Sequence, residues 1–318
     1  MKHLLSIADL TRQDIERIMS VAESFAEVVE RDIKKVPTLR GRTIVNLFYE
    51  SSTRTSSSFE LAAKRLSADV VNVKSVGSAV DKGESLKDTV ATLSAYDPAA
   101  IVIRAPWAGA ASFVARYSSA SVVNAGDGKR EHPSQALLDV FTLRKRVGRS
   151  LDGIQIWIVG DVLHSRVARS NVLAFTRMGA KVTVCGPPTL IPRDVETLGC
   201  RIAYDLESIR EADVVYALRM QNERMEDAPV PSLREYVARY QIDRRRLEPR
   251  QLLMHPGPVN RGVELASEVI DSPQSLIVEQ VASGLVVRMA VLYELLSADG
   301  SSNGARLSYP TPTEKQPA

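Results

Sequence analysis

Short apolar runs alternate with longer amphipathic stretches over most of the chain. Short apolar runs are typical of strands buried in a parallel sheet, and apolar residues repeating every third or fourth position are typical of helices. This pattern predicts strands at Thr43–Phe48, Val70–Val73, Ala100–Ile103, Ser121–Asn124, Ile154–Val159, Lys181–Val184, Arg201–Ala203, Val214–Ala217 and Leu252–Met254. It predicts helices over 6–30, 53–66, 84–95, 108–117, 133–147, 163–178 and 277–296.

The strand–helix alternation runs twice and is interrupted at the polar segment Gly148-Arg149-Ser150. Strands separated by helices predict parallel strand–helix–strand units with helices on both faces of the sheet. We therefore expect two doubly wound α/β domains, 1–148 and 149–283, with the C-terminal helix 284–298 joining the first domain. The Ser-, Gly- and Pro-rich tail 299–318 is expected to be disordered. Because ligands of such sheets bind beyond the carboxyl ends of the strands, we expect the active site in the cleft between the domains.

Composition narrows the class of protein without indicating its chemistry. The chain has 318 residues, 44% hydrophobic and 25% charged, and a net charge of +3. These values exclude a wholly disordered chain and predict neither nucleic-acid nor membrane binding. No apolar run approaches the ~18 residues of a membrane helix. Met1–Leu5 shows no signal-peptide core, and Cys185 and Cys200 are the only cysteines. A reducing, cytoplasmic location is therefore expected.

A hydroxyl-rich turn follows the first predicted strand. Every residue from 51 to 58 is serine or threonine except Arg54. Such a composition is also found in flexible linkers, and a single serine or threonine often only caps a helix. Here, however, the segment lies between a strand and an amphipathic helix, and one cap needs one hydroxyl. Helix N-terminal amides, several hydroxyl groups and a guanidinium together favour a phosphate-binding site.

The segment Ser52-Thr53-Arg54-Thr55 resembles the S-T-R-T-R carbamoyl phosphate motif of the aspartate/ornithine carbamoyltransferase family, with Ser56 in place of the final arginine. The resemblance extends over roughly residues 1–300 and implies that these four residues bind carbamoyl phosphate. Ser78 and Lys82 match a loop that, in this family, reaches the active site of the neighbouring subunit. The resemblance therefore also implies a homotrimer whose active sites are shared between subunits. Regulatory chains are possible further partners in this family.

Two further matches complete the carbamoyl phosphate half of the site. Arg104 follows a predicted strand, and the resemblance implies that it binds the phosphate and the carbamoyl oxygen. His132-Pro133-Ser134-Gln135 resembles the family's H-P-[ST]-Q motif. There His132 is expected to donate a hydrogen bond to the carbamoyl oxygen, and Gln135 to bind the carbamoyl amide. Proline in the first turn of a helix places both residues at its N-terminus.

The second half resembles the aspartate-binding part of the family. Gly160-Asp161 follows a strand, but Val162 and Ser165 replace the glycines of a dinucleotide fingerprint, so NAD binding is not expected. Arg166, Arg219 and Gln221 match the family's aspartate-binding residues, and the resemblance implies that Lys82 binds aspartate as well. Two arginines suit a dicarboxylate because each guanidinium can hold one carboxylate.

A last loop distinguishes the aspartate enzymes of the family from the ornithine enzymes. His255-Pro256-Gly257-Pro258 resembles the H-P-x-P loop, in which the backbone at Pro256 and Gly257 accepts hydrogen bonds from the substrates. The ornithine enzymes have a cysteine at the position of Pro256. Together with the arginines, this favours L-aspartate as the second substrate.

The reaction expected from the resemblance is transfer of the carbamoyl group from carbamoyl phosphate to L-aspartate, an early step of pyrimidine biosynthesis. No nucleophilic triad, reactive cysteine, metal-ligand spacing or cofactor motif is evident, so we expect direct attack without metal or cofactor. Arg54, Thr55, Lys82, Arg104 and His132 are the expected catalytic residues. Two alternatives remain: a carbamoyltransferase acting on another amino acid, and a two-domain protein that only binds small anions.

Overall fold

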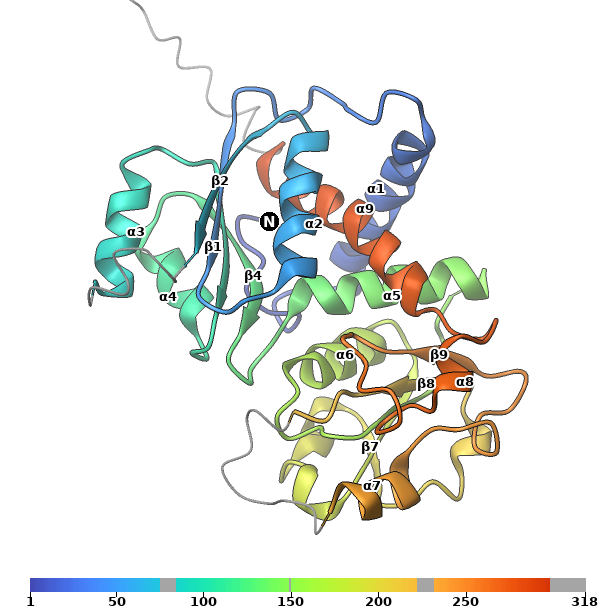
Figure 1. The fold of residues 1–318 in the computed structure, drawn as a ribbon. Coiled ribbons are helices and arrows are strands. Elements are labelled where there is room, and N and C mark those ends of the chain that lie inside the picture. The colour runs from blue at the N-terminus through green and yellow to red at the C-terminus, as the bar shows by residue number, and fades with distance from the viewer. Residues whose placement is uncertain (75–83, 149, 222–231, 298–318) are drawn as a thin grey trace, which may run out of the picture.

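The computed structural model describes residues 1–74, 84–148, 150–221 and 232–297 (Figure 1). Within them the strands form two wholly parallel sheets. The first sheet has the order β2-β1-β3-β4. The second has the order β7-β6-β5-β8-β9. The predicted fold class, two doubly wound α/β sheets, is confirmed. None of the described helices is long and apolar enough to cross a membrane.

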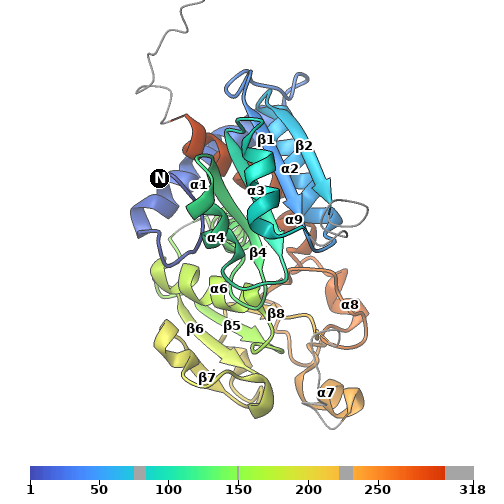
Figure 2. The same cartoon turned by 90° about the vertical axis from the view of Figure 1, so that its left-hand side faces the viewer.

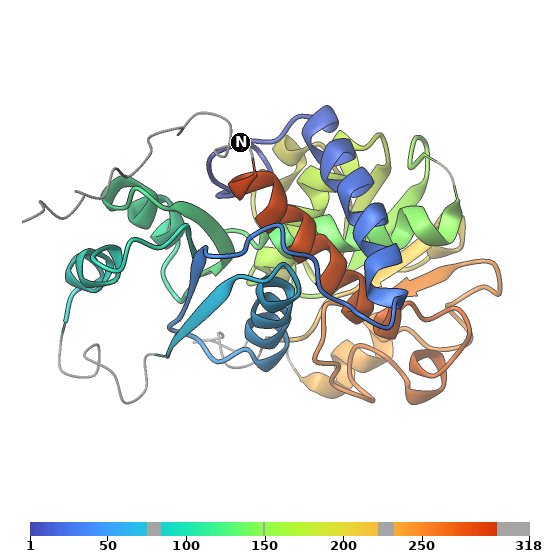
Figure 3. The same ribbon diagram turned by 90° about the horizontal axis from the view of Figure 1, so that it is seen from above.

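Helices cover both faces of the first sheet, whose strands are β1 (Thr43–Phe48), β2 (Asp69–Lys74), β3 (Ala100–Ala105) and β4 (Ser121–Asp127). On one face, α3 (Leu86–Ser94) and α4 (Ala110–Tyr117) pack over an apolar cluster that includes Val45 and Ile101 (Figure 2). The opposite face is covered by α1 (Arg12–Glu30), α2 (Thr53–Arg65), α5 (Pro133–Val147) and α9 (Ile277–Leu296). The C-terminal helix α9 packs against α1, α2 and α5 (Figure 3).

The second sheet consists of β5 (Gln155–Val159), β6 (Lys181–Cys185), β7 (Arg201–Ala203), β8 (Val214–Ala217) and β9 (Leu252–Met254). On one face it is covered by α6 (Arg166–Arg177), and α6 packs against α5 of the first half. Apolar side chains of both sheets therefore belong to one continuous core, which contains Ile44 as well as Ile156. The helices α7 (Leu233–Tyr240) and α8 (Ser267–Ile270) enclose a separate cluster on the other face.

The predicted start of the first helix is wrong by about two turns. The helix begins at Arg12 because Thr11 and Asp14 form a reciprocal capping box that fixes its N-terminus. The residues before it run along the first sheet instead, where Leu4 pairs with Val123 of β4. Helices α7 and α8 were not predicted. The predicted tail 299–318 lies outside the described residues.

Candidate active site

A cleft of about 800 Å³ lies at the carboxyl ends of strands from both sheets. It is lined by Arg104 near the end of β3, by the segments that follow β1, β4, β5, β8 and β9, and by α9. The predicted site residues that the structure describes all line this cleft: Ser52, Thr53, Arg54, Thr55, Arg104, His132, Gln135, Arg166, Arg219, Gln221, Pro256 and Gly257. Ser78 and Lys82 lie outside the described residues.

The N-terminus of α2 is open toward the cleft. Ser52 occupies the N-cap position, but its hydroxyl makes no capping hydrogen bond, so the helix-cap interpretation of this segment does not hold for Ser52. Thr55 is buried in the first turn. Burial, followed by repulsion from Arg219, lowers the pKa of Arg54. The helix end therefore combines unused amide donors with a cation in a partly desolvated position, which suits a phosphate group.

Glu50 joins two arginines from different halves of the molecule. Its Oε2 accepts a hydrogen bond of 2.6 Å from Nη2 of Arg166 and lies 3.4 Å from Nε of Arg104. All three side chains are largely buried. A second feature shapes this region: Gly126 has a φ of 121°, and a β-carbon there would lie 3.1 Å from the guanidinium of Arg166. Glu50 therefore orients the guanidinium of Arg166, and the absence of a side chain at Gly126 leaves room for it.

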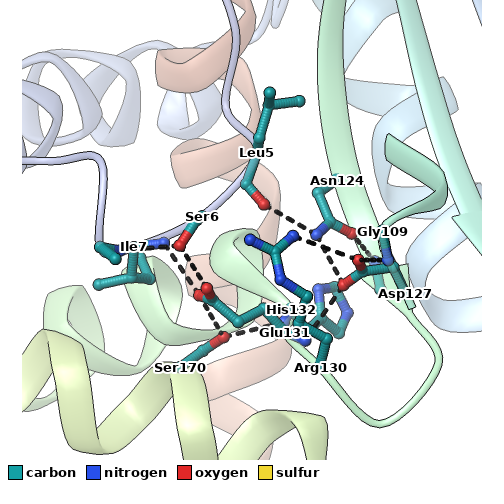
Figure 4. A network of polar contacts seen from close by, with 12 residues as sticks. Leu5, Ser6, Ile7, Gly109, Asn124, Asp127, Arg130, Glu131, His132 and Ser170 are labelled. Carbon is teal, nitrogen blue, oxygen red and sulfur yellow. Dashed lines mark hydrogen bonds and ion pairs between the residues drawn. The ribbon is translucent and has the colours of Figure 1, made fainter. Parts of the chain in front are cut away.

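The backbone of His132 is fixed by a buried polar network at the end of β4 (Figure 4). Its N–H donates to Oγ of Ser170 on α6 at 2.9 Å, and that hydroxyl donates to Glu131 at 3.1 Å. Glu131 also accepts hydrogen bonds from Ser6 and from the N–H of Ile7. Three segments distant in sequence therefore define the position of the α5 N-terminus.

The imidazole of His132 is electrically neutral at physiological pH. Burial, and then the charges of Arg104, Arg166 and Arg288, lower its pKa well below the ordinary value of 6.5. The Ser134 hydroxyl lies 3.4 Å from Nδ1. We assign the proton to Nε2, which makes this nitrogen a hydrogen-bond donor rather than a base.

The loop after β9 is ordered by a second buried histidine. His255 accepts a 2.8 Å hydrogen bond from the N–H of Gly257 at Nδ1, and its Nε2 lies 3.2 Å from Oε1 of Glu264. Because the pKa of His255 is lowered, mainly by burial, we assign it as neutral and donating to Glu264. Gly257 has a φ of 62°, and a β-carbon there would lie 2.8 Å from Cζ of Arg54. The loop thus packs directly against the arginine at the α2 N-terminus.

Several lining residues were missed by sequence reasoning. Glu50 precedes the hydroxyl-rich turn, and its proximity to that turn was the only available signal. Ser58, Gln280 and Arg288 reach the cleft from helices, where spacing does not reveal which polar residue faces a cavity. Arg288 is the most informative omission because a buried arginine in the mostly apolar segment 277–296 is unusual.

The cleft is strongly cationic. Among the described residues that line it there are five arginines (Arg54, Arg104, Arg166, Arg219 and Arg288) and one carboxylate, that of Glu50. Burial lowers the pKa of Arg288 to about 10, a sign that its charge is incompletely compensated. No group of three His, Cys, Asp or Glu side chains within the described ranges is arranged to hold a metal ion. Such a cavity can bind two small anions side by side.

Fold and site define a two-sheet α/β protein with an anion-binding cleft between its halves. Two family descriptions match the chain: "Aspartate/ornithine carbamoyltransferase, carbamoyl-P binding domain" over residues 2–145, and "Aspartate/ornithine carbamoyltransferase, Asp/Orn binding domain" over residues 152–295. The chain therefore belongs to the aspartate/ornithine carbamoyltransferase family, as its motifs predict.

Individual relatives agree with this assignment. The chain is 56% identical over 305 residues to the aspartate carbamoyltransferase catalytic subunit of Salinispora arenicola, covering 94% of this chain and 99% of that protein. It also resembles the structure of aspartate transcarbamoylase from Trypanosoma cruzi in complex with carbamoyl aspartate and phosphate. The TM-score is 0.83 at 31% identity, over 93% of this chain and 96% of that one. The catalytic subunit of M. jannaschii aspartate transcarbamoylase gives a TM-score of 0.81 at 36% identity, over 94% and 99% of the two chains.

Proposed function

We propose that this chain transfers the carbamoyl group of carbamoyl phosphate to the amino group of L-aspartate, giving N-carbamoyl-L-aspartate and phosphate. The observation that carries the proposal is the cleft itself, which gathers the phosphate-type site at α2 and two further arginines, Arg166 and Arg219. The high identity to proteins named aspartate carbamoyltransferase catalytic subunit supports it. This activity is an early step of pyrimidine biosynthesis.

In the proposed mechanism the two substrates react directly. The aspartate amine attacks the carbamoyl carbon, a tetrahedral intermediate forms, and the bond from that carbon to the phosphate oxygen breaks. The leaving phosphate takes the proton released by the amine. Because no protein nucleophile is needed, catalysis comes from positioning the substrates and from stabilising negative charge.

We assign the phosphate to Ser52, Thr53 and Arg54 at the α2 N-terminus, with Arg104 beside them. Thr55, Arg104 and neutral His132 donate to the carbamoyl oxygen as it becomes negative. The low pKa of His132 makes it a poor general base, and the neutral imidazole still retains one N–H to donate.

The carbamoyl amide is assigned to the side chain of Gln135 and to the backbone at Pro256 and Gly257. The aspartate carboxylates are assigned to Arg166, Arg219 and Gln221. The position of these residues along one cleft supports this division.

We further propose a homotrimer in which Ser78 and Lys82 of one subunit complete the site of its neighbour. Large aromatic side chains exposed near the ends of α3 and α4 (Tyr96, Trp107 and Tyr117) support a subunit contact on that side of the first sheet. Cytoplasmic location and the division into domains 1–148 with 284–298, and 149–283, belong to the same proposal. The packing of α9 against α1, α2 and α5 supports that division.

A product assay tests the proposed activity. The purified chain is incubated with carbamoyl phosphate and a panel of amino acids, including L-aspartate, L-glutamate and L-ornithine, and carbamoylated products are quantified. We expect turnover with L-aspartate and little with the others. A preference for another amino acid would identify a different member of the family, and binding of phosphate without any turnover would favour an anion-binding protein.

A further inference from the structure

Asp139 is a buried carboxylate that the proposed mechanism does not use. It lies on α5 one turn after Gln135, and its side chain has no exposed surface. Oδ1 accepts hydrogen bonds from Nε2 of Gln135 at 3.0 Å and from Nε2 of Gln280 at 2.7 Å. Oδ2 accepts from Nδ2 of Asn171 at 2.9 Å and from the Tyr216 hydroxyl at 2.7 Å. Four donors from α5, α6, β8 and α9 therefore converge on one side chain.

The two donors on Oδ1 both belong to residues that line the cleft. One of the two N–H groups of the Gln135 amide donates to Asp139, which fixes the orientation of the side chain, and we assign Oε1 as the atom that it offers to the carbamoyl NH₂ group. Gln280 is held in the same way, and its Oε1 accepts a 3.0 Å hydrogen bond from the N–H of His255. Through Gln280, Asp139 therefore also orients the loop that begins at His255.

Burying this carboxylate is unfavourable by itself. Burial raises the pKa of Asp139 to about 6 although its four donors act to lower it. An ionised carboxylate accepts hydrogen bonds at both oxygens and donates none. Each neighbouring amide must therefore turn its NH₂ group toward Asp139. An apolar side chain of similar size would not fix this orientation.

We propose that Asp139 is a positioning residue that makes the cleft selective for the NH₂ group of the carbamoyl donor. It fixes the Gln135 amide with its oxygen available to the ligand, and through Gln280 it holds the backbone of the His255–Gly257 loop. This inference rests on the proposed function and names the structural origin of its selectivity for a carbamoyl over an acyl phosphate.

Two ligands that differ only at the recognised group test the proposal. Phosphonoacetamide carries NH₂ where acetonylphosphonate carries CH₃, and both present the same phosphonate and carbonyl groups. Dissociation constants are measured by titration calorimetry for the wild-type chain and for Asp139→Leu. We expect the variant to bind phosphonoacetamide about 10- to 100-fold more weakly. The reason is that Oε1 of Gln135 and the backbone of the His255–Gly257 loop, which accept hydrogen bonds from the NH₂ group, lose their fixed orientation. Binding of acetonylphosphonate should change by less than about threefold.

Matched variants separate positioning from general stability. Tyr216→Phe removes a donor from Oδ2 and leaves the Oδ1 contacts in place, so it should lower the melting temperature without changing the ratio of the two dissociation constants. Asp139→Asn should largely restore that ratio, because the Tyr216 hydroxyl and the Asn171 amide can reverse their roles and leave an oxygen facing the glutamines. If Asp139→Leu does not fold, Gln280→Met tests the same link between Asp139 and His255 and should also weaken phosphonoacetamide selectively.

An equal loss for both ligands, or a selective loss in Tyr216→Phe, would overturn the proposal. A wild-type chain that binds phosphonoacetamide no better than acetonylphosphonate would overturn it as well. The product assay tests the proposed function separately. If the wild-type chain turns over carbamoyl phosphate and aspartate, but Asp139→Leu leaves the ratio of the two dissociation constants unchanged, only the role of Asp139 is rejected.

Discussion

Replacement of His132 tests whether the cleft acts by donating a hydrogen bond or by accepting a proton. The imidazole is buried at the N-terminus of α5, and burial together with Arg104, Arg166 and Arg288 lowers its pKa well below 6.5. At neutral pH it therefore carries one N–H, which we assign to the carbamoyl oxygen. His132→Ala removes this donor, whereas His132→Gln retains an amide N–H donor.

The expected magnitude follows from the loss of one donor to a developing oxyanion. Such a loss reduces kcat by about 10²- to 10³-fold, or roughly 3–4 kcal/mol. We expect His132→Ala to fall in this range and His132→Gln to lose about tenfold, because the amide donor is displaced from the position of the imidazole. Initial rates at saturating carbamoyl phosphate and varied L-aspartate, recorded from pH 6 to 9, supply the measurement.

The pH profile decides between the two roles. If His132 is a neutral donor, the ionisations in the wild-type kcat profile above pH 6 persist in His132→Gln. A limb of the wild-type profile that disappears in this variant would show that His132 titrates during turnover and would refute the reasoning.

The stability of the protein gives an independent check on the same pKa. A histidine that is neutral in the folded state takes up a proton in the unfolded state below pH 6.5, so folding becomes less favourable as the pH falls below this value. Chemical unfolding between pH 7.5 and 5 should therefore show a weaker pH dependence for His132→Gln than for the wild type. Part of the dependence should remain, because the pKa of His255 is also lowered.

Three further outcomes follow from the cleft and the core. Arg219→Lys keeps the charge near Arg54 but loses the planar fork, so the KM for aspartate should rise about tenfold while that for carbamoyl phosphate stays nearly constant; equal changes in both would contradict the assignment. Burial raises the pKa of the Cys185 thiol to about 12 and that of the Cys200 thiol to about 11. A thiol reagent should therefore modify both cysteines only after unfolding, and rapid labelling of the native protein would disprove their burial. Phosphate at 100 times its dissociation constant should stabilise the fold by about 2.7 kcal/mol, visible as a rise of several degrees in Tm; an unchanged Tm would argue against a phosphate site.

The architecture was largely predictable because it depends on local patterns. Strands buried on both faces, such as β5, appear as continuous apolar runs, and their alternation with helices fixes a parallel sheet. Helix α7 escaped prediction because it buries only Tyr236 and Tyr240, and one apolar pair four positions apart does not establish a helical repeat. Helix α8 is a single turn of four residues, shorter than any periodicity can detect.

The residues that line the cleft were predictable where they belong to recognisable motifs that follow strands, as at Ser52–Thr55 and His132. The site was not predictable where a residue acts through contacts between distant segments. Gln280 and Asp139 are 141 residues apart in sequence, and Arg288 contacts Ser58 across 230 residues. No spacing rule connects such pairs, because their proximity results from the packing of α9 on α2 and α5.

The charge of the cleft indicates the chemistry of the substrates better than the net charge of the whole chain does. The whole chain carries +3, spread over 41 basic and 38 acidic residues. The described lining of the cleft instead combines five arginines with the single carboxylate of Glu50. Carbamoyl phosphate as a dianion and aspartate with its two carboxylates are both attracted by this excess, and Lys82 of the neighbouring subunit would add to it in the proposed trimer. The arginines therefore locate the anionic groups of both substrates, which the net charge of the whole chain conceals.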